Sequence, residues 1–345
     1  MTLQTMSRRA VVRLVGGLVL TTAILLGDLI GTPPPAIARP KRLAVGLMSV
    51  GNTGIWPNIV DVRVTYLNWA DLQPGPHRFR LDRIGKIVRS VRHDGDVLRL
   101  RIFAGRGAPD WVKRRFGTVR VVDPVDGMDA AVPRWWRRGF MRVYRRFQAH
   151  LAARFDDNPT IRAVTITGAM TVHGEPFIRG VTSPTTRRNL RRAGYTQRKD
   201  RRAILASIRA HRPWHRTRQI LNLNPWQFVR RDGSFGQDVT FTNKAMNRFR
   251  ATFGRRAILQ NNSIRSRYIT DTMPGQLGEM FAHMRALGGP LSFQTARSSR
   301  VGDLAVVLAW CVDQGAHGVE VQRGAVDQIT AATAAEIDSA LEANA

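Results

Sequence analysis

Residues 163–176 read AVTITGAMTVHGEP, and the fold prediction turns on this stretch. Its first half alternates β-branched with smaller residues, which predicts a strand rather than a helix. It ends in Gly174-Glu175-Pro176, so the predicted strand delivers one carboxylate at its C-terminal tip, on a backbone that Pro176 stiffens. Barrel enzymes keep their chemistry at the C-terminal ends of parallel strands. The alternative is a Gly-x-Pro turn that happens to contain a glutamate.

Seven further strand-like segments accompany this one, and amphipathic helical segments separate them. The predicted strands cover residues 43–48, 62–69, 97–103, 219–224, 257–262, 291–295 and 318–322, and the predicted helices cover 81–91, 135–155, 201–210, 243–253, 276–286 and 301–313. Eight strands alternating with helices predict an α/β protein with a single (β/α)8 TIM-type barrel over residues 39–345. A doubly wound sheet gives the same alternation, but no glycine-rich phosphate loop follows the first predicted strand.

Residues 1–38 have the composition of a signal peptide. Arg8-Arg9 and Arg13 form a basic segment, residues 14–27 are apolar, and Ala36-Ile37-Ala38 offers small residues where a signal peptidase reads them. The apolar stretch is shorter than the roughly 20 residues that span a bilayer. The paired arginines resemble a twin-arginine signal. We therefore predict a secreted or cell-envelope-associated protein with no membrane span after cleavage; an uncleaved anchor is the alternative.

The chain is strongly basic, with a formal net charge of +29. Residues 1–38 contribute three arginines and one aspartate, so the remainder still carries +27. Arginine-rich codon usage is one explanation, and attraction to an anionic cell-envelope polymer is the other. The densest basic run, residues 187–202, has Tyr195 as its only aromatic residue, so nucleic acid is not favoured as a partner. The single cysteine, Cys311, excludes an intramolecular disulfide and is predicted to lie in the core.

Several predicted strands alternate polar with apolar residues. Asn222 and Asn224 alternate with leucines, Arg101 follows Leu100, and Glu320 lies between two valines. If the apolar set faces the surrounding helices, the polar set points into the barrel. Burying such groups costs several kcal/mol unless they bond to one another or to a ligand. A polar mouth suits a hydroxyl-rich ligand such as a sugar, and a self-satisfied polar network is the alternative.

Three tryptophans follow predicted strands, and each offers a flat face on which a sugar ring can stack. These are Trp69, Trp111 and Trp226. Together with the asparagine, arginine and glutamate side chains, they predict a carbohydrate cleft.

The sequence resembles one family of barrel enzymes. Residues 65–76, TYLNWADLQPGP, with Phe79 and residues 81–84, LDRI, resemble the W-x-x-L-x-P-x-P-G-x-(F/Y)-x-(F/L) segment of β-galactosidase-like glycoside hydrolases of clan A, family 42 in particular. Residues 100–111 resemble the next strand of these enzymes and its Pro-x-Trp turn. The resemblance extends over most of residues 43–325. It implies hydrolysis of O-glycosidic bonds in an unidentified oligo- or polysaccharide, with Glu175 where the clan carries its general acid/base.

Two departures from the clan affect the expected mechanism. The clan places asparagine before the acid/base, where this chain has Gly174, and a nucleophilic glutamate at the end of strand seven, where this chain has Gln294. An amide cannot form the glycosyl ester of a retaining mechanism. We therefore predict Glu320, on strand eight, as the second carboxylate, with Asp271 and Asp303 as weaker candidates.

The predicted catalytic residues are thus Glu175, as general acid, and Glu320. The predicted substrate-binding residues are Asn68, Trp69, Arg101, Trp111, His173, Asn222, Asn224, Trp226, Asn262 and Gln294. No cofactor is predicted, and no metal site, because the histidines lack a convincing ligand spacing. An exported glycoside hydrolase is the leading prediction. The alternatives are a non-catalytic carbohydrate-binding barrel, which Gln294 favours, and a basic envelope-binding protein.

Overall fold

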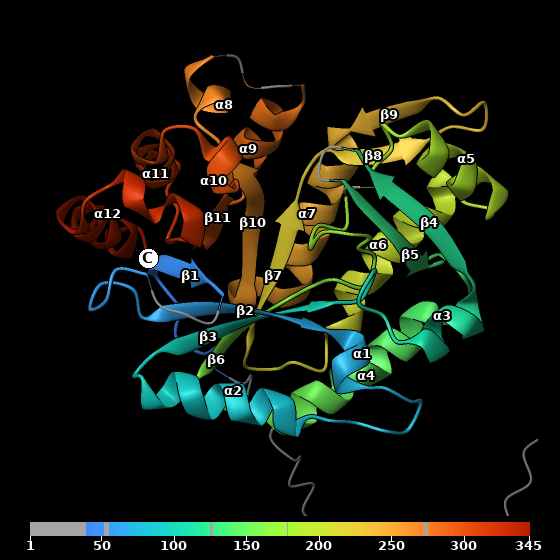
Figure 1. Ribbon diagram of the computed structural model, residues 1–345, viewed down its shortest axis with the longest axis horizontal. Helices are drawn as coiled ribbons and strands as arrows, with labels where there is room; N and C mark the ends of the chain where they lie inside the picture. The colour runs from blue at the N-terminus through green and yellow to red at the C-terminus, as the bar shows by residue number, and fades with distance from the viewer. Residues whose placement is uncertain (1–38, 52–54, 125–126, 178, 272, 274) are drawn as a thin grey trace, which may run out of the picture. The chain divides into compact units, whose positions relative to one another are not determined.

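A computed structural model describes residues 39–51, 55–124, 127–177, 179–271, 273 and 275–345 (Figure 1). The predicted signal peptide, residues 1–38, lies outside the described residues, so export stays a prediction. Eight parallel strands close into a barrel in the order β1-β12-β11-β10-β7-β6-β3-β2. This closure confirms the predicted (β/α)8 barrel.

The barrel strands match the eight predicted ones, with shifted ends. They are β1 (Gly46–Val50), β2 (Val62–Asn68), β3 (Val97–Phe103), β6 (Ile161–Thr165), β7 (Arg218–Leu223), β10 (Ala257–Ile264), β11 (Leu291–Thr295) and β12 (Gly318–Gln322). The fourth barrel strand, β6, ends ten residues before Glu175. The expectation that Glu175 occupies a strand tip was therefore wrong, because residues 166–177 form turns rather than a continued strand.

Helices follow most of the strands and surround the barrel (Figure 1). They are α1 (Trp69–Leu72), α2 (Asp82–His93), α3 (Asp110–Phe116), α4 (Phe140–Phe155), α5 (Pro184–Arg192), α6 (Gln197–Ala210), α7 (Val239–Phe253), α8 (Arg267–Thr270), α9 (Leu277–Ala286), α10 (Ser298–Val301), α11 (Leu304–Asp313) and α12 (Ala331–Ala343), with short 3-10 turns η1 (Gly254–Arg256) and η2 (Arg323–Gln328). Helix α12 covers β1, where its Asp338 carboxylate accepts the Leu47 N–H at 2.5 Å. Cys311 is fully buried in α11, as predicted.

Alternating side chains explain how the strands and helices fit together. Helix α2 buries Ile84, Val88 and Val91, which share one face at helical spacing. Strand β3 sends Leu98 and Leu100 into the same apolar core outside the barrel. The intervening arginines of β3 must therefore point to the barrel axis.

The N-terminal end of the barrel is closed by packing. Small apolar clusters fill it, one built on Met48, Val62 and Val64 and another on Ala163, Ile220 and Ile258. At the same end, the Lys41 ammonium donates to the carbonyls of Asn158 at 2.6 Å and Ile161 at 2.8 Å. Burial lowers the pKa of Lys41 to about 8. This end has the features of a stability face, which leaves the opposite end for chemistry.

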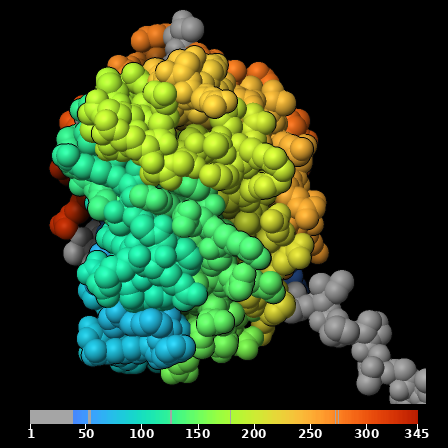
Figure 2. All heavy atoms as spheres, turned by 90° about the vertical axis from the view of Figure 1, so that its right-hand side faces the viewer, coloured from blue at the N-terminus to red at the C-terminus, as the bar shows by residue number. Residues whose placement is uncertain are grey.

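Two antiparallel hairpins extend from the C-terminal ends of the barrel strands, and the sequence did not predict either. One pairs β4 (Thr118–Asp123) with β5 (Met128–Pro133), and the other pairs β8 (Trp226–Val229) with β9 (Phe235–Asp238). In Figure 2 the yellow residues of the β8–β9 hairpin lie against the yellow-green residues of α5 at the top of the face shown. The hairpins follow β3 and β7, so they flank the mouth of the barrel.

A buried carboxylate joins the outer elements on this side. Asp200, in the first turn of α6, is fully buried. It accepts hydrogen bonds from the indole N–H groups of Trp135 and Trp226, both at 2.8 Å, and from the Tyr195 hydroxyl at 3.0 Å. The Arg179 guanidinium forms an ion pair with it at 3.3 Å. Four donors on one carboxylate satisfy its lone pairs, which is the condition for burying such a charge.

A buried histidine makes stability depend on pH. The His211 ring lies 2.8 Å from the Tyr144 hydroxyl and 2.7 Å from the Gln219 side-chain oxygen, and burial lowers its pKa to about 3. At pH 5 the unfolded chain therefore binds a proton that the folded chain excludes, so acidification from pH 7 favours unfolding. His211 alone should cost about 2 kcal/mol of unfolding free energy at pH 5.

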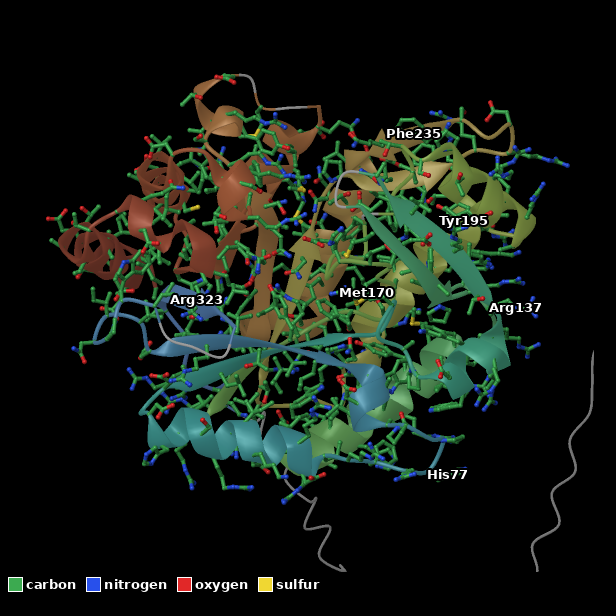
Figure 3. All side chains as sticks on the ribbon, viewed as in Figure 1. His77, Arg137, Met170, Tyr195, Phe235 and Arg323 are labelled. Atoms are coloured by element: carbon green, nitrogen blue, oxygen red, sulfur yellow. The ribbon has the colours of Figure 1, made fainter. Side chains whose placement is uncertain are left out.

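Urea unfolding at pH 7 and pH 5 measures this effect. The difference between the two midpoints should shrink in His211→Gln and persist in His77→Gln, which alters an exposed histidine at the periphery (Figure 3). An unchanged difference in His211→Gln would assign the acid sensitivity to other groups.

Candidate active site

A cleft of about 510 Å³ opens at the C-terminal end of the barrel. Six of the twelve predicted site residues line it: Arg101, His173, Glu175, Asn224, Asn262 and Gln294. Side chains that the sequence did not single out complete the lining, among them Tyr66, Phe103, Asp123, Asn261 and Tyr268. The lining thus combines aromatic rings, amides and charged groups, which is the composition expected for a polar ligand that also has apolar faces.

Glu175 is the most exceptional carboxylate of the cleft. Its side chain is only 4% exposed, and its Oε2 atom is buried without a hydrogen-bond partner among the described residues. A buried, unpartnered carboxylate oxygen is costly, so it needs a proton, a water or a ligand to satisfy it. Glu175 is therefore the carboxylate of the cleft that a bound ligand would satisfy.

The structure explains why glycine precedes Glu175. A Cβ atom at Gly174 would lie 3.0 Å from the Arg101 Cδ atom and 3.3 Å from the Asn222 side-chain nitrogen. The space that a side chain would need is thus already filled from β3 and β7. Asn222 is fully buried, and neither its amide nitrogen nor its amide oxygen has a hydrogen-bond partner among the described residues. Asn222 is not among the residues that line the cleft, but its amide lies directly beside Gly174.

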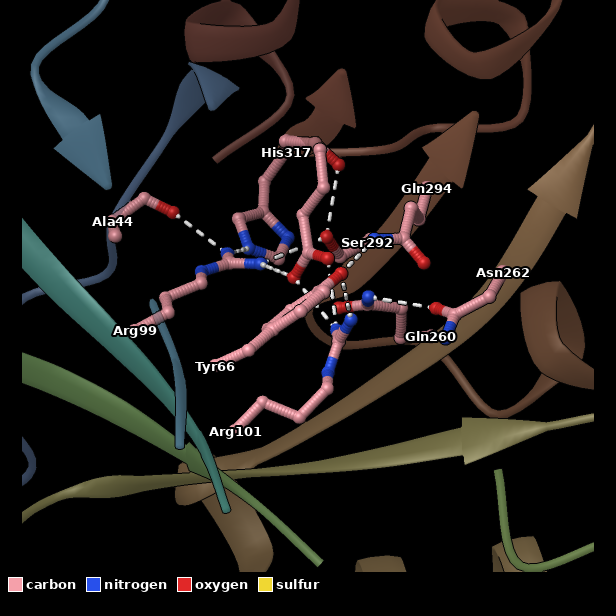
Figure 4. Close-up of polar contacts among 11 residues, drawn as sticks. Ala44, Tyr66, Arg99, Arg101, Gln260, Asn262, Ser292, Gln294 and His317 are labelled. Atoms are coloured by element: carbon pink, nitrogen blue, oxygen red, sulfur yellow. Dashed lines mark hydrogen bonds and ion pairs between the residues drawn. The ribbon is translucent and has the colours of Figure 1, made fainter. Parts of the chain in front are cut away.

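Glu320 does not line the cleft, and the structure places it one layer deeper than predicted. Its carboxylate is fully buried and accepts two hydrogen bonds from Arg101, at 2.8 and 3.1 Å, with Arg99 3.7 Å away (Figure 4). Burial alone would lower the pKa of Arg101, but the attraction of Glu320, with contributions from Tyr66 and Glu175, raises it. Glu320 thus neutralises buried arginines and is not among the residues that line the cleft, while its catalytic role stays a prediction.

Tyr66 and Gln294 lie above this ion pair. The Tyr66 hydroxyl accepts hydrogen bonds from Arg101 at 2.8 Å and from the Gln294 amide at 2.6 Å (Figure 4). Burial raises the pKa of Tyr66, so the phenol keeps its proton. Since both contacts donate to the phenolic oxygen, its own O–H remains available to a ligand. The inward position of Tyr66 could have been read from its alternation with Val62 and Val64.

A histidine–aspartate pair forms another part of the lining. The His173 Nε2 atom lies 2.6 Å from an Asp123 carboxylate oxygen. Asp123 ends β4, so the unpredicted β4–β5 hairpin delivers this second carboxylate to the cleft. Its partner, His173, lies two residues before Glu175 in the sequence. The pair is therefore linked through the backbone to the predicted general acid, Glu175.

The end of β10 supplies amides on a distorted backbone. The register of β10 against β11 shifts between Asn261 and Ile264, and Ser263 adopts φ +67° there. Left-handed backbone is unfavourable for serine and, like a bulge, gathers at functional sites. Asn261 and Asn262 consequently turn toward the cleft, where Asn224 has a buried amide nitrogen without a partner among the described residues.

Four predicted substrate-binding residues lie elsewhere. Trp69 is fully buried beside Phe147, and Trp111 donates to the Gln73 carbonyl at 3.1 Å. Trp226 is fully buried against Phe241, with its N–H on Asp200. These indoles face the outer core, because the chain turns away from the barrel axis where each strand ends. Asn68 is exposed outside the cleft, 3.3 Å from Asp71.

No group of three His, Cys, Asp or Glu side chains among the described residues could hold a metal ion. No described helix combines the length and apolarity that crossing a bilayer requires.

Solved structures share this fold. The chain is similar to the catalytic domain of a β-amylase from Paenibacillus polymyxa, with a TM-score of 0.54 and 12% identity over 81% of this chain and 93% of that one. It is also similar to β-galactosidases from Halorubrum lacusprofundi (TM-score 0.51, 11% identity) and from Bacillus circulans sp. alkalophilus (0.50, 12%). The matches cover 81% and 82% of this chain but only 53% and 50% of those enzymes. No protein-family model and no curated protein matches the sequence. The likeness therefore establishes a barrel of the kind found in glycoside hydrolases.

Proposed function

We propose that this protein hydrolyses a glycosidic bond in the cleft, with Glu175 as the general acid. The observation that carries the proposal is the buried, unpartnered Glu175 oxygen at the C-terminal mouth of the barrel. Glu175 would give its proton to the glycosidic oxygen as the bond to the anomeric carbon breaks. The rings of Tyr66, Phe103 and Tyr268 offer faces for sugar stacking in place of the predicted tryptophans.

The second catalytic group in this proposal is the Asp123–His173 pair. Water attacks the anomeric carbon and loses a proton to the pair; the pair then releases this proton to solvent, and Glu175 takes up a proton from solvent before the next turnover. Because Asp123 is the one other carboxylate among the described residues that line the cleft, it replaces Glu320 in the mechanism. A base that activates water gives inversion of configuration, since no glycosyl ester forms on the enzyme.

Turnover of Asp123→Asn tests this assignment. We expect kcat to fall about 100-fold, the lower range for loss of a positioned acid–base group. The matched control is Asp129→Asn in the same hairpin, where the exposed carboxylate pairs with Arg120 across the strands. Proton NMR of the first product should show the inverted anomer. A retained anomer, or full activity in Asp123→Asn, would remove the pair from the mechanism.

A non-catalytic carbohydrate-binding barrel is the second candidate. It is favoured by Gln294, an amide at the end of the seventh barrel strand, and by the burial of Glu320 between arginines. A panel of oligo- and polysaccharides, assayed for both binding and released reducing ends, separates the two. Binding with no release from any member of the panel would favour the binding module.

A further inference from the structure

One wall of the cleft is a cluster of arginines built by two neighbouring loops. Strands β10 and β11 pair in parallel, and the Ile264 carbonyl accepts the Ala296 N–H at 2.8 Å. Arg265 follows Ile264, and Arg297 follows Ala296. The two arginines therefore start from adjacent positions of the backbone. Both line the cleft. The register of the barrel thus determines that two guanidinium groups stand on the same wall.

A third arginine is fixed to the same wall through Ser266. The Ser266 N–H donates to the Val301 carbonyl at 2.8 Å, and its hydroxyl accepts the Asp303 N–H at 3.1 Å. These bonds join the loop that carries Arg265 to helix α10, which carries Arg300. Arg300 also lines the cleft. We name Arg265, Arg297 and Arg300 the arginine wall.

An aromatic ring lies within this wall. The Arg265 guanidinium sits over the Tyr268 ring, 4.8 Å from its centroid, and the ring itself lines the cleft. Stacking restricts the guanidinium and so lowers the entropy lost when it binds a ligand. The wall therefore combines an aromatic ring with charged donors in the lining of the cleft.

The charges of the lining are unbalanced. Glu320 neutralises the charge of Arg101, but among the described residues that line the cleft four further arginines, the arginine wall and Arg106, stand against two carboxylates, Asp123 and Glu175. A neutral sugar gains nothing from such an excess, whereas an anionic ligand is attracted by it. Guanidinium groups match the geometry of carboxylate and of sulfate or phosphate oxygens by paired hydrogen bonds.

We infer that the saccharide bound in this cleft is acidic, carrying an anionic substituent on the sugar unit that contacts the arginine wall. A uronic acid is the simplest such unit, because its ring carboxylate can form paired hydrogen bonds with one guanidinium group. This inference rests on the proposed function for the identity of the cleft. It adds the substrate class, which neither the fold nor Glu175 specifies.

Binding of matched saccharides to the full chain tests the inference. Each probe pair consists of an oligouronide and the neutral oligosaccharide made from it by carboxyl reduction, and a sulfated form of the neutral member is the third arm. Calorimetry on Glu175→Gln prevents turnover during the titration. At least one oligouronide should bind at least tenfold more tightly than its reduced partner, and added salt should narrow the difference.

The variant Arg265→Gln/Arg300→Gln should abolish that preference. Its matched control, Arg89→Gln/Arg92→Gln, removes the same charge from exposed positions of α2 and should retain the preference. Equal binding of the sulfated arm would assign the wall to anionic substituents in general, and tighter binding of the uronide would assign it to carboxylates. A neutral member that binds as well as its acidic partner, no binding of any acidic member, or a preference that survives in Arg265→Gln/Arg300→Gln would overturn the inference.

The same experiments separate this inference from the proposed function. Wall-dependent binding of an oligouronide that the unaltered chain never cleaves would refute hydrolysis and leave the acidic ligand standing. Cleavage of neutral saccharides without any acidic preference would support hydrolysis and refute the acidic ligand.

Discussion

Glu175→Gln should lower kcat by about 10³-fold, within the range typical of removing a general acid. Glutamine preserves the shape of the side chain but has no proton to give to the leaving oxygen. Saccharide binding should survive, because the amide still fits the space beside Gly174 and Arg101. Circular dichroism and the affinity of the variant check that the fold and the cleft are intact.

The dependence on the leaving group makes this prediction specific to acid catalysis. An aryl glycoside with an acidic phenol needs little protonation, so Glu175→Gln should slow its hydrolysis far less than that of a natural saccharide. The matched control is Glu279→Gln, an exposed glutamate on α9, which should retain full activity. An equal loss on both substrates would mean that Glu175 positions the sugar and is not the proton donor.

The second large effect should be on stability, in Asp200→Asn. Asparagine keeps one acceptor oxygen but places an N–H₂ group against the donors of Tyr195 and Trp226, and it removes the carboxylate charge from the ion pair with the buried Arg179 guanidinium. Breaking a buried ion pair from one side typically costs about 3–5 kcal/mol. For a domain of this size we expect the melting temperature to fall by roughly 10 °C.

Asp157→Asn is the matched control for that measurement. Asp157 pairs with Arg216 at 3.1 Å, but its side chain is 85% exposed, and exposed pairs contribute less than about 1 kcal/mol. The melting temperature should therefore fall strongly in Asp200→Asn and hardly at all in Asp157→Asn. Similar changes in melting temperature in both variants would show that the buried Asp200 contributes no more to stability than the exposed Asp157.

The barrel could be predicted from the sequence because the apolar residues of each strand and each helix recur at the spacing typical of that element. The end of the fourth strand could not, because residues 166–172 continue the β-branched pattern but have no strand to pair with. The last ladder bond of β6 is the Ile166 N–H on the Ile220 carbonyl. Local propensity records which residues favour a strand, whereas pairing decides where the strand ends.

Only part of the site was predicted, because the local pattern of residues does not determine how far along the barrel axis a side chain lies. Alternation correctly sent Glu320 and Arg101 into the barrel, but it gives no depth along the axis. The register pairs Glu320 with Gln294, two residues below the end of β12, and there it meets the arginines. The burial of Trp226 was not foreseen, because its hydrogen-bond partner, Asp200, is distant in sequence. Asp123 was missed because no strand had been predicted over the residues of the β4–β5 hairpin.

Two residues after Glu175 are held in place by contacts with the rest of the barrel, and this affects how a substrate would enter the cleft. Phe177 is fully buried with its carbonyl on the Gln227 N–H at 3.3 Å, and Arg179 is anchored on Asp200. Held in this way, Phe177 and Arg179 cannot swing over a substrate as a lid, so the proposed general acid, Glu175, would be in place before a sugar arrives. If the proposed function holds, capture should be a single diffusive encounter. Its observed rate should then rise in proportion to saccharide concentration, without the plateau that a slow closing step imposes.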